Sequence, residues 1–312
     1  MRVDEIDART APDDVLLALH ALEQVCGPPG EPFRDPQLSL SYYRHWPPGE
    51  VRRRWVAETD GTPIGSAALL VHGPALVYAE IFVQPESRRQ GVGSALLDVV
   101  RAAAREHGVR SFFGHHHDDA GAAFAAHSGA HDDQRDVRAV LDLRSAELPE
   151  PVVPAGWRLR SWIGAAPEEL VASFASARDA MNDAPAPGGM EMPAMTAEDV
   201  RRIEATAALR GREVRVTVAL DDHDEVGAFT DVRVTPGTAV ASTDDTAVVA
   251  VNRGLGLGRA VKAESLRRLR AERPEVETVS TMNAEHNGAM RHINTQLGFV
   301  PTSTLTTTVL TL

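Results

Sequence analysis

Two short segments of the chain carry arginine and glycine at the same spacing. Residues 83–97 read VQPESRRQGVGSALL and residues 250–264 read AVNRGLGLGRAVKAE, so both contain R-x-x-G-x-G between an apolar stretch and a helix-like stretch. The first-turn amides of a helix lack internal partners and carry partial positive charge, and glycine lets a phosphate approach them. The pattern predicts an anion site, while an ordinary helix start with packing glycines is the alternative for either copy alone. Four arginines would add full charges suited to a diphosphate: Arg88, Arg89, Arg253 and Arg259.

The spacing excludes two common phosphate-binding motifs. A Walker loop, G-x-x-x-x-G-K-[ST], requires a lysine, and the only lysine of the chain, Lys262, stands in the wrong place. A dinucleotide fingerprint, G-x-G-x-x-G, requires a third glycine. That position holds Leu96 in the first copy and Arg259 or Val261 in the second. A different class of phosphate ligand is therefore expected.

The R-x-x-G-x-G spacing resembles the acetyl-CoA motif of the GNAT N-acetyltransferase superfamily. The strand exit Val83-x-Pro85-x-x-Arg88 matches the same family. The segment MNAEHNGAMRHINTQLGF (282–299) resembles its second conserved block, an Asn-containing loop followed by a helix that ends in Leu-Gly-Phe. The order of strands and helices in each half fits one such unit. The resemblance therefore covers nearly the whole chain and points to the tandem GNAT proteins of actinobacteria.

This resemblance implies a fold and a set of cofactor contacts. The fold class would be α/β (α+β), with two tandem GNAT units, each a mixed, mostly antiparallel central sheet flanked by helices. The cofactor would be acetyl-CoA, held by the strand before each motif, by the motif and by the second block. The implied contacts are Ile81, Val83, Arg88, Arg89, Gln90, Gly91, Val92, Gly93 and Ser94 in the first copy, and Thr246, Val248, Arg253, Gly254, Leu255, Gly256, Leu257, Gly258, Arg259, Asn283, Asn287 and Asn294 in the second.

Some positions depart from the family pattern. Ala250 replaces the usual proline, and the second block of the first copy is reduced to DDAGAAFAAHSGA, with Ala130 where an aromatic residue is usual. Many family members protonate the leaving thiolate with a tyrosine four residues before the final glycine of the block. The matching positions are Ala125 and Asn294, and neither side chain can act as that acid. Water or another group is expected to do so.

Two carboxylates are candidate catalytic residues. Acetyl transfer needs a neutral amine, and a simple alkylamine with a pKa near 10.4 is only about one part in two thousand neutral at pH 7. Family members often carry a carboxylate on the strand before the motif, and Glu80 and Asp245 each stand eight residues before the motif arginine. The resemblance also implies that a backbone amide near Val83 or Val248 polarises the thioester carbonyl. A solvent-facing strand end or a salt bridge is the alternative role for each carboxylate.

Two further segments invite a functional interpretation. HHHDD (115–119) suggests a metal, but adjacent histidines of an extended segment point to opposite faces, so a polar loop or acceptor-site lining is preferred and no metal is expected. MNDAP (181–185) lies on the loop that covers the acceptor in GNAT proteins, where Asn182 and Asp183 could contact a cationic amine. A helix stop explains the same residues. Tyr42 and Tyr43 hold the corresponding place in the first copy.

Periodicity predicts the same element order twice. The first copy is expected to contain a helix at 11–25, a hairpin at 51–73, a strand at 75–83, a helix at 91–108, a strand at 109–114, a helix at 120–130 and a strand at 136–143. The second is expected to contain a helix at 168–181, a hairpin at 213–234, a strand at 246–251, a helix up to Arg273, a strand at 276–282 and a final helix. Loops are expected at 26–37 and 182–195.

Composition limits the partners. The formal net charge of −12 argues against nucleic acid. No apolar run approaches the roughly 18–20 residues of a membrane span. The N-terminus has no signal-peptide core, and Cys26 is the only cysteine, so a cytoplasmic protein without membrane contact is expected, as a monomer or homodimer.

The predicted domains are 1–146 and 157–312, joined by a proline-rich linker at 147–156. The predicted function is acetyl-CoA-dependent N-acetylation of a small-molecule amine, with the second copy as the catalytic unit. The alternatives are a non-catalytic acyl-CoA-binding or sensor protein, and a pair of one active and one structural unit. The identity of the acceptor lies beyond the sequence.

Overall fold

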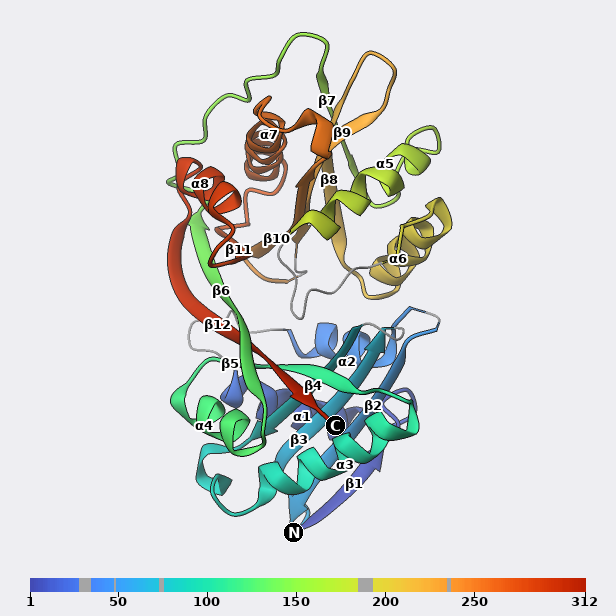
Figure 1. Ribbon diagram of the computed structural model, residues 1–312, viewed down its shortest axis with the longest axis vertical. Coiled ribbons are helices and arrows are strands. Elements are labelled where there is room, and N and C mark those ends of the chain that lie inside the picture. Colours follow the sequence, from blue (N-terminus) through green and yellow to red (C-terminus); the bar gives the residue numbers. More distant parts are fainter. Residues whose placement is uncertain (28–34, 48, 73–75, 185–192, 235–236) are drawn as a thin grey trace. The chain divides into compact units, whose positions relative to one another are not determined.

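The computed structural model describes the whole chain except residues 28–34, 48, 73–75, 185–192 and 235–236 (Figure 1). The chain divides into two compact units. The first comprises Met1–Arg135 with Leu305–Leu312, and the second comprises Asp136–Thr304. Parts of the loops expected at 26–37 and 182–195 lie outside the described residues.

The first unit contains a sheet in the order β1-β2-β3-β4-β5-β12. Its pairs are antiparallel except β4 with β5, which is parallel. The strands are β1 (Arg2–Ile6), β2 (Val51–Thr59), β3 (Thr62–His72), β4 (Leu76–Val83), β5 (Ser111–His116) and β12 (Val300–Thr311). The helices are α1 (Asp13–Cys26), α2 (Pro36–Arg44), the short 3₁₀ helix η1 (Pro85–Ser87), α3 (Val92–Glu106) and α4 (Asp119–His127).

Helices cover both faces of this sheet. On one face, α3 packs Leu96 and Val100 against Ala67, Leu69 and other small or aliphatic residues of the strands. On the other face, α1 and α2 enclose a smaller apolar cluster against β2. The alternation of side chains along β4 therefore assigns the odd-numbered residues 77–83 to the α3 face and the even-numbered ones, Glu80 included, to the α1 and α2 face.

The second unit contains a sheet in the order β6-β11-β10-β9-β8-β7. Here the pair β10 and β11 is parallel, and the others are antiparallel. The strands are β6 (His131–Asp142), β7 (Arg158–Ile163), β8 (Glu213–Leu220), β9 (Val226–Val234), β10 (Val240–Val248) and β11 (Thr278–Ala284). The helices are α5 (Val171–Arg178), the 3₁₀ helix η2 (Asp179–Asp183), α6 (Ala197–Leu209), the 3₁₀ helix η4 (Ala250–Asn252), α7 (Leu257–Glu272) and α8 (Gly288–Gln296).

The faces of the second sheet follow from its apolar clusters. α7 packs Ala263 and Leu266 against Val232 of β9 and its neighbours. α5 packs Phe174 on the opposite face, where its ring meets those of Trp162 and Phe229 edge-on at 5.4 Å in each case. From Ala228 to Val234, the even-numbered residues of β9 therefore face α7, and the odd-numbered residues face α5.

Two strands do not pair within their own sequence copy. β6, which ends the first copy, pairs with β11 from Asp136 to Asp142. β12, which ends the second copy, pairs with β5 from Thr306 to Thr311. The compact units therefore do not coincide with the two sequence copies, and the expected boundaries at 146 and 157 stay a prediction about the copies.

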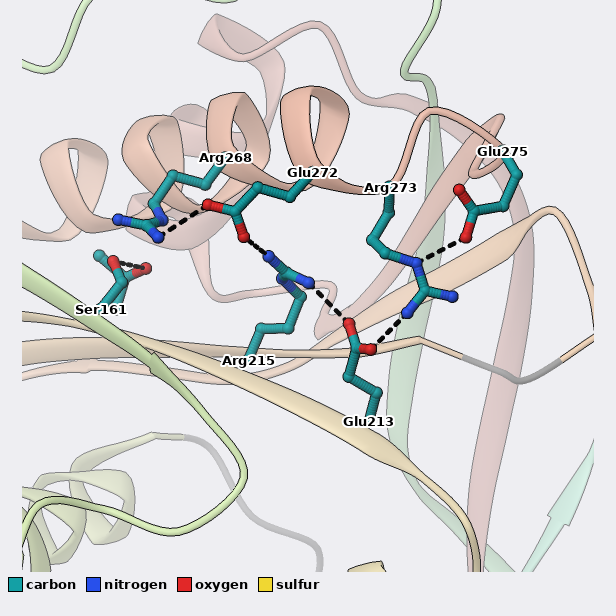
Figure 2. Close-up of polar contacts among 8 residues, drawn as sticks. Ser161, Glu213, Arg215, Arg268, Glu272, Arg273 and Glu275 are labelled. Atoms are coloured by element: carbon teal, nitrogen blue, oxygen red, sulfur yellow. Dashed lines mark hydrogen bonds and ion pairs between the residues drawn. The ribbon is translucent and has the colours of Figure 1, made fainter.

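A chain of ion pairs fastens the end of α7 to the start of β8 (Figure 2). Arg215 is 6% exposed and pairs with Glu213 at 2.6 Å and with Glu272 of α7. Glu272 also pairs with Arg268 at 2.7 Å, and Arg273 joins Glu213 to Glu275. Satisfying a buried guanidinium on both sides offsets its desolvation, so this network positions α7 against the sheet.

The expected fold class is confirmed, with corrections to individual elements. β5 reaches His116, so two of the three histidines belong to a strand. β10 begins at Val240, earlier than expected. Its sequence VASTDDTAV is too polar to be recognised as a strand, and pairing with the neighbouring strands stabilises it. The elements β1, β7, β12, α2 and α6 were not predicted from the sequence. None of the described helices is long and apolar enough to cross a membrane.

Candidate functional site

Both R-x-x-G-x-G segments fold into the same loop. Arg88 and Arg253, at the ends of the 3₁₀ helices, have φ/ψ of −67°/156° and −69°/154°. The next residue has positive φ in both loops, 62° at Arg89 and 81° at Gly254. The first motif glycine follows with φ of 84° at Gly91 and 80° at Gly256, and each one is the N-cap of the next helix. The sequence repeat is therefore also a repeat of backbone conformation.

These helix starts fit a diphosphate. α3 and α7, like α1 and α5, have no side-chain cap, and they begin with glycine. A Cβ added at Gly91 or Gly256 would meet nothing within 4 Å, so no other residue crowds the N-cap of either helix. First-turn amides have no acceptor inside their helix and can form an anion cradle at such an open start. The starts of α3 and α7 therefore fit the phosphates of a coenzyme.

The second motif glycine has a different role. A Cβ at Gly93 would lie 3.1 Å from the Phe124 ring of α4, and one at Gly258 would lie 3.1 Å from Val248 and 3.5 Å from Ile293 of α8. Glycine at this position lets the following helix pack closely. Of the two motif glycines, the first faces the open space and the second serves helix packing.

The motif arginines also bind groups of the protein itself. Arg88 Nε donates to the carbonyl of Val83 at 3.3 Å, and its Nη1 lies 3.4 Å from a carboxylate oxygen of Asp118. Arg253 Nε donates to the carbonyl of Val248 at 3.2 Å, and its guanidinium pairs with Asp183. Each arginine side chain therefore folds back onto the last residue of the strand before it. Asp183, which the sequence placed near the acceptor, thus contacts the R-x-x-G-x-G loop, and its role toward an acceptor stays a prediction.

Next to each loop a parallel strand pair separates. The described residues of the first unit pair β4 with β5 only at Tyr78 and Phe113, and β4 continues to Val83. In the second unit, β10 and β11 pair up to Thr243 and Thr281, and β10 continues to Val248. The ends of β4 and β10, which include Ile81 and Thr246, offer backbone groups along one edge to an extended ligand.

The remaining predicted contacts differ in how far their side chains are exposed. Val92 and Leu257 are 2% and 0% exposed, so their side chains belong to the core and only their amides can face a ligand. Gln90 donates to the Glu86 carbonyl at 2.9 Å. The exposed residues Ser94 and Leu255 and the half-buried Arg259 lie at the helix starts.

The predicted asparagines gather where β11 meets α8. Asn287 caps α8 by accepting from the Met290 amide at 3.2 Å. Asn294 is 4% exposed and donates to Asn283 Oδ1 at 2.6 Å, while its own Oδ1 is buried without a hydrogen-bond partner. Asn283 lies on β11, past the last β10–β11 pair at Thr281, and Asn294 reaches it from α8.

The candidate carboxylates have different surroundings. Asp245 pairs with Arg178, which the sequence analysis did not single out, and its backbone N–H donates to Asp231 at 2.8 Å. Asp231 is 3% exposed on the same face of the sheet as Phe229. The one available signal for it was a charged residue inside the apolar run VGAFTDVRV. Glu80 lies opposite Ala68 on β3. Burial acts to lower the pKa of Arg54, but the negative charges near it, Glu80 among them, raise it, and Arg54 pairs with Glu23.

Two buried groups of the second unit have displaced pKa values. Burial, helped by the charge of Asp245, raises the pKa of Asp231 to about 6, although Arg178 acts in the opposite direction. Burial lowers the pKa of Lys262, which is 2% exposed on α7, to about 7, and Asp231 partly offsets this. The only lysine of the chain therefore lies inside the second unit, where its ammonium is 5.5 Å from the Phe299 ring.

The histidines and tyrosines of the first unit make contacts within the protein. His115 stacks on Tyr78 with ring centroids 5.5 Å apart, and His116 Nε2 lies 3.1 Å from Asp132. The described residues contain no group of three or more His, Cys, Asp and Glu that could hold a metal ion. Tyr43 is 3% exposed and donates to Glu23 at 2.6 Å, so its side chain is held inside the first unit.

Comparison with known proteins decides the family. A model described as the Acetyltransferase (GNAT) family matches residues 16–129. The mycothiol acetyltransferase of Salinispora tropica is 30% identical over 325 residues, which cover 95% of this chain and 97% of that protein. The chain belongs to the GNAT acetyltransferase family. The resemblance inferred from the motif spacing and from the second block is confirmed.

Other relatives of this GNAT chain match it in part. The mycothiol acetyltransferase of Clavibacter michiganensis is 34% identical over 175 residues, 56% of this chain and 44% of that protein. That of Actinosynnema mirum is 36% identical over 156 residues, 48% of this chain and 49% of that protein. The chain thus spans about half the length of these curated relatives or slightly less.

Solved structures match both GNAT units together. A tandem GNAT protein from the clavulanic acid biosynthesis pathway, solved without AcCoA, has a TM-score of 0.83 at 25% identity, covering 99% of this chain and 98% of that one. A GCN5-related N-acetyltransferase from Sphaerobacter thermophilus has a TM-score of 0.71 at 15% identity, covering 99% of this chain and 95% of that one, and shows the fold alone.

Proposed function

We propose that this protein is an acetyl-CoA-dependent N-acetyltransferase that acts on the amine of a small molecule. The observation that carries the proposal is the uncapped glycine loop beside a separated strand pair, present twice with nearly identical backbone angles. The acidic chain disfavours a nucleic-acid partner, and its single cysteine suits a cytoplasmic protein, as monomer or homodimer. The names of the relatives support acetyl transfer.

Each part of the site has a role in this reaction. Acetyl-CoA supplies an acetyl group activated as a thioester. The amides at the start of α3 or α7 would hold its diphosphate, and the open edge of β4 or β10 would hold its extended arm. A backbone amide near Val83 or Val248 would stabilise negative charge that develops on the carbonyl oxygen. The acceptor amine would lose a proton to a base or to water before attack.

We place catalysis in the second unit, for two structural reasons. β10 is bulged between Thr243 and Thr246, whereas the described register of β3 with β4 has no shift. The second unit also keeps the hydrogen bond between Asn294 of α8 and Asn283 on the separated end of β11, and it leaves one buried amide oxygen of Asn294 without a partner in the protein. In the first unit the equivalent of Asn294 is Ala125, which offers no polar group.

The test is release of free thiol from acetyl-CoA across a library of small amines. Wild type and a Gly91→Val variant should release thiol faster with a suitable amine, whereas Gly256→Val should lose that stimulation. A reversed pattern would move catalysis to the first unit. A wild type that binds acetyl-CoA without any amine-stimulated release would support the sensor alternative.

A second prediction concerns the base. If Asp245 accepts the proton directly, Asp245→Ala should lower turnover by about 10²-fold and leave acetyl-CoA affinity unchanged, because the diphosphate cradle lies elsewhere. The pH profile decides the point, since a rising limb present in wild type should disappear in the variant. If the limb survives in both Asp245→Ala and Glu80→Ala, the proton leaves to water or the limb belongs to the amine. Asp245 would then serve its ion pair with Arg178 alone.

A further inference from the structure

Asp231 is a carboxylate placed in the middle of a sheet. It lies on β9, three residues before the strand ends, and is 3% exposed. The residues that share its face pack against α5, so its carboxylate is surrounded by the apolar side of that helix and by Phe229. Burial of a carboxylate is costly unless its oxygens accept hydrogen bonds or pair with a cation. The groups that Asp231 contacts therefore indicate its role.

Those contacts are made to a β-bulge. β9 and β10 pair at Val232 with Thr243 and at Thr230 with Thr246, so two residues of β10, Asp244 and Asp245, stand opposite Asp231 alone. The extra residue of a bulge leaves a backbone group without its ladder partner. Asp231 Oδ1 accepts the N–H of Asp245 at 2.8 Å. The side chain therefore replaces the backbone acceptor that the bulge removes.

Arg178 completes the arrangement from α5. One of its terminal nitrogens lies 3.4 Å from Asp231 Oδ2, and the other pairs with the carboxylate of Asp245. Its guanidinium lies over the rings of Phe174 and Phe229, at 5.6 Å and 5.3 Å from their centroids. Asp231 and Asp245 are thus fixed by one cation, which locks the bulge in place.

The bulge changes which way β10 faces. Ala241 belongs to the cluster under α7, whereas Ala247, also odd-numbered, belongs to the cluster under α5. In a regular strand these two residues would share a face. The shift therefore also reverses the direction of the backbone N–H groups from Thr246 onward. In the first unit the residue opposite Glu80 is Ala68, and that strand runs without a register shift.

We propose that Asp231 is a positioning residue of the acetyl-transfer site in the second unit. By holding the Asp245 amide, its carboxylate maintains the bulge and aims the amides of Thr246 and Val248, which alternate with amides directed at β9, into the gap beside β11, where they meet the acetyl carbonyl. This inference rests on the proposed function. Asp231 acts through the backbone of β10 and need not touch acetyl-CoA.

The test compares two ligands at the second site. In a Gly91→Val background, which disables the first cradle, calorimetry gives the affinities of acetyl-CoA and of CoA. Asp231→Ala should weaken acetyl-CoA by about 3- to 10-fold, the range of one hydrogen bond, and leave CoA unchanged. Asp231→Asn keeps an oxygen acceptor for the Asp245 amide and should preserve the ratio. These measurements need no turnover, so they stand even if no amine proves to be a substrate.

Three results would overturn the proposal. The first is an unchanged affinity ratio in folded Asp231→Ala, and the second is equal loss in Asp231→Asn and Asp231→Ala. The third is a wild-type second site that binds both ligands equally. If Asp231→Ala does not fold, the double variant Asp231→Ala/Arg178→Met removes both buried charges and is measured in the same way. Ala68 shows that this fold accommodates alanine at the equivalent position.

Discussion

Gly256→Val is expected to weaken acetyl-CoA binding at the second cradle by about 10- to 100-fold. Gly256 has a φ of 80°, and a β-branched residue in that conformation costs on the order of 1–3 kcal/mol. No atom lies within 4 Å of a Cβ at this position, so the variant has space to fold. The strain instead turns the loop away and misplaces the first-turn amides of α7. Calorimetry with acetyl-CoA measures the loss directly.

Matched variants separate loop geometry from side-chain bulk. Gly91→Val should have the same effect on the first cradle, because Gly91 has a φ of 84° and equally open space. Gly254→Arg should be mild, since Arg89 occupies the equivalent position with a φ of 62°. If the double variant Gly91→Val/Gly256→Val binds acetyl-CoA like wild type, neither loop is a diphosphate site and the proposed function fails with it.

Arg178→Met is expected to lower the free energy of unfolding by about 3 kcal/mol at pH 8. Removing one partner of a buried ion pair costs about 3–5 kcal/mol, because the other charge is left uncompensated. The side chains of Arg178 and Asp231 are 13% and 4% exposed, so solvent screens them little. Urea unfolding followed in the second unit measures the change. Arg160→Met, which breaks the exposed pair with Glu169, is the control and should change stability little.

The effect of Arg178→Met should depend on pH with a definite sign. The pKa of Asp231 is raised on folding from 3.8 to about 6. Between these pH values the native state keeps a proton that the unfolded state has lost, so stability falls as pH rises through this window. Arg178 lowers that pKa, so its removal raises it further and extends the loss to higher pH. The cost of the substitution should therefore be smaller at pH 5 than at pH 8. A cost independent of pH would show that the variant acts through lost packing on Phe174 and Phe229.

The sequence by itself determined the repeated strand, glycine loop and helix start. A strand end, the glycines after it and the helix start that follows are properties of a few consecutive residues, so R-x-x-G-x-G was sufficient to predict this order at both sites. The same holds for α8, whose cap Asn287 is three residues from the amide that it accepts. Local patterns also predicted the hairpins and most of the helices, but not α2 and α6, because the periodicity of a segment reflects burial on one face. The positive φ values in the two loops came only from the structure.

Only the tertiary structure decided what surrounds the cradles. Asp231 and Asp245 are 14 residues apart and Arg178 is 67 residues from Asp245, so their meeting depends on β9 pairing with β10 and on α5 packing over both. A bulge is a property of two strands together, which the sequence of β10 alone cannot show. The pairing of β6 and β12 outside their own sequence copies was likewise decided by the tertiary structure. Which sheet a terminal strand joins depends on the unpaired edge that is offered to it, and that edge exists only once the rest of the chain has folded.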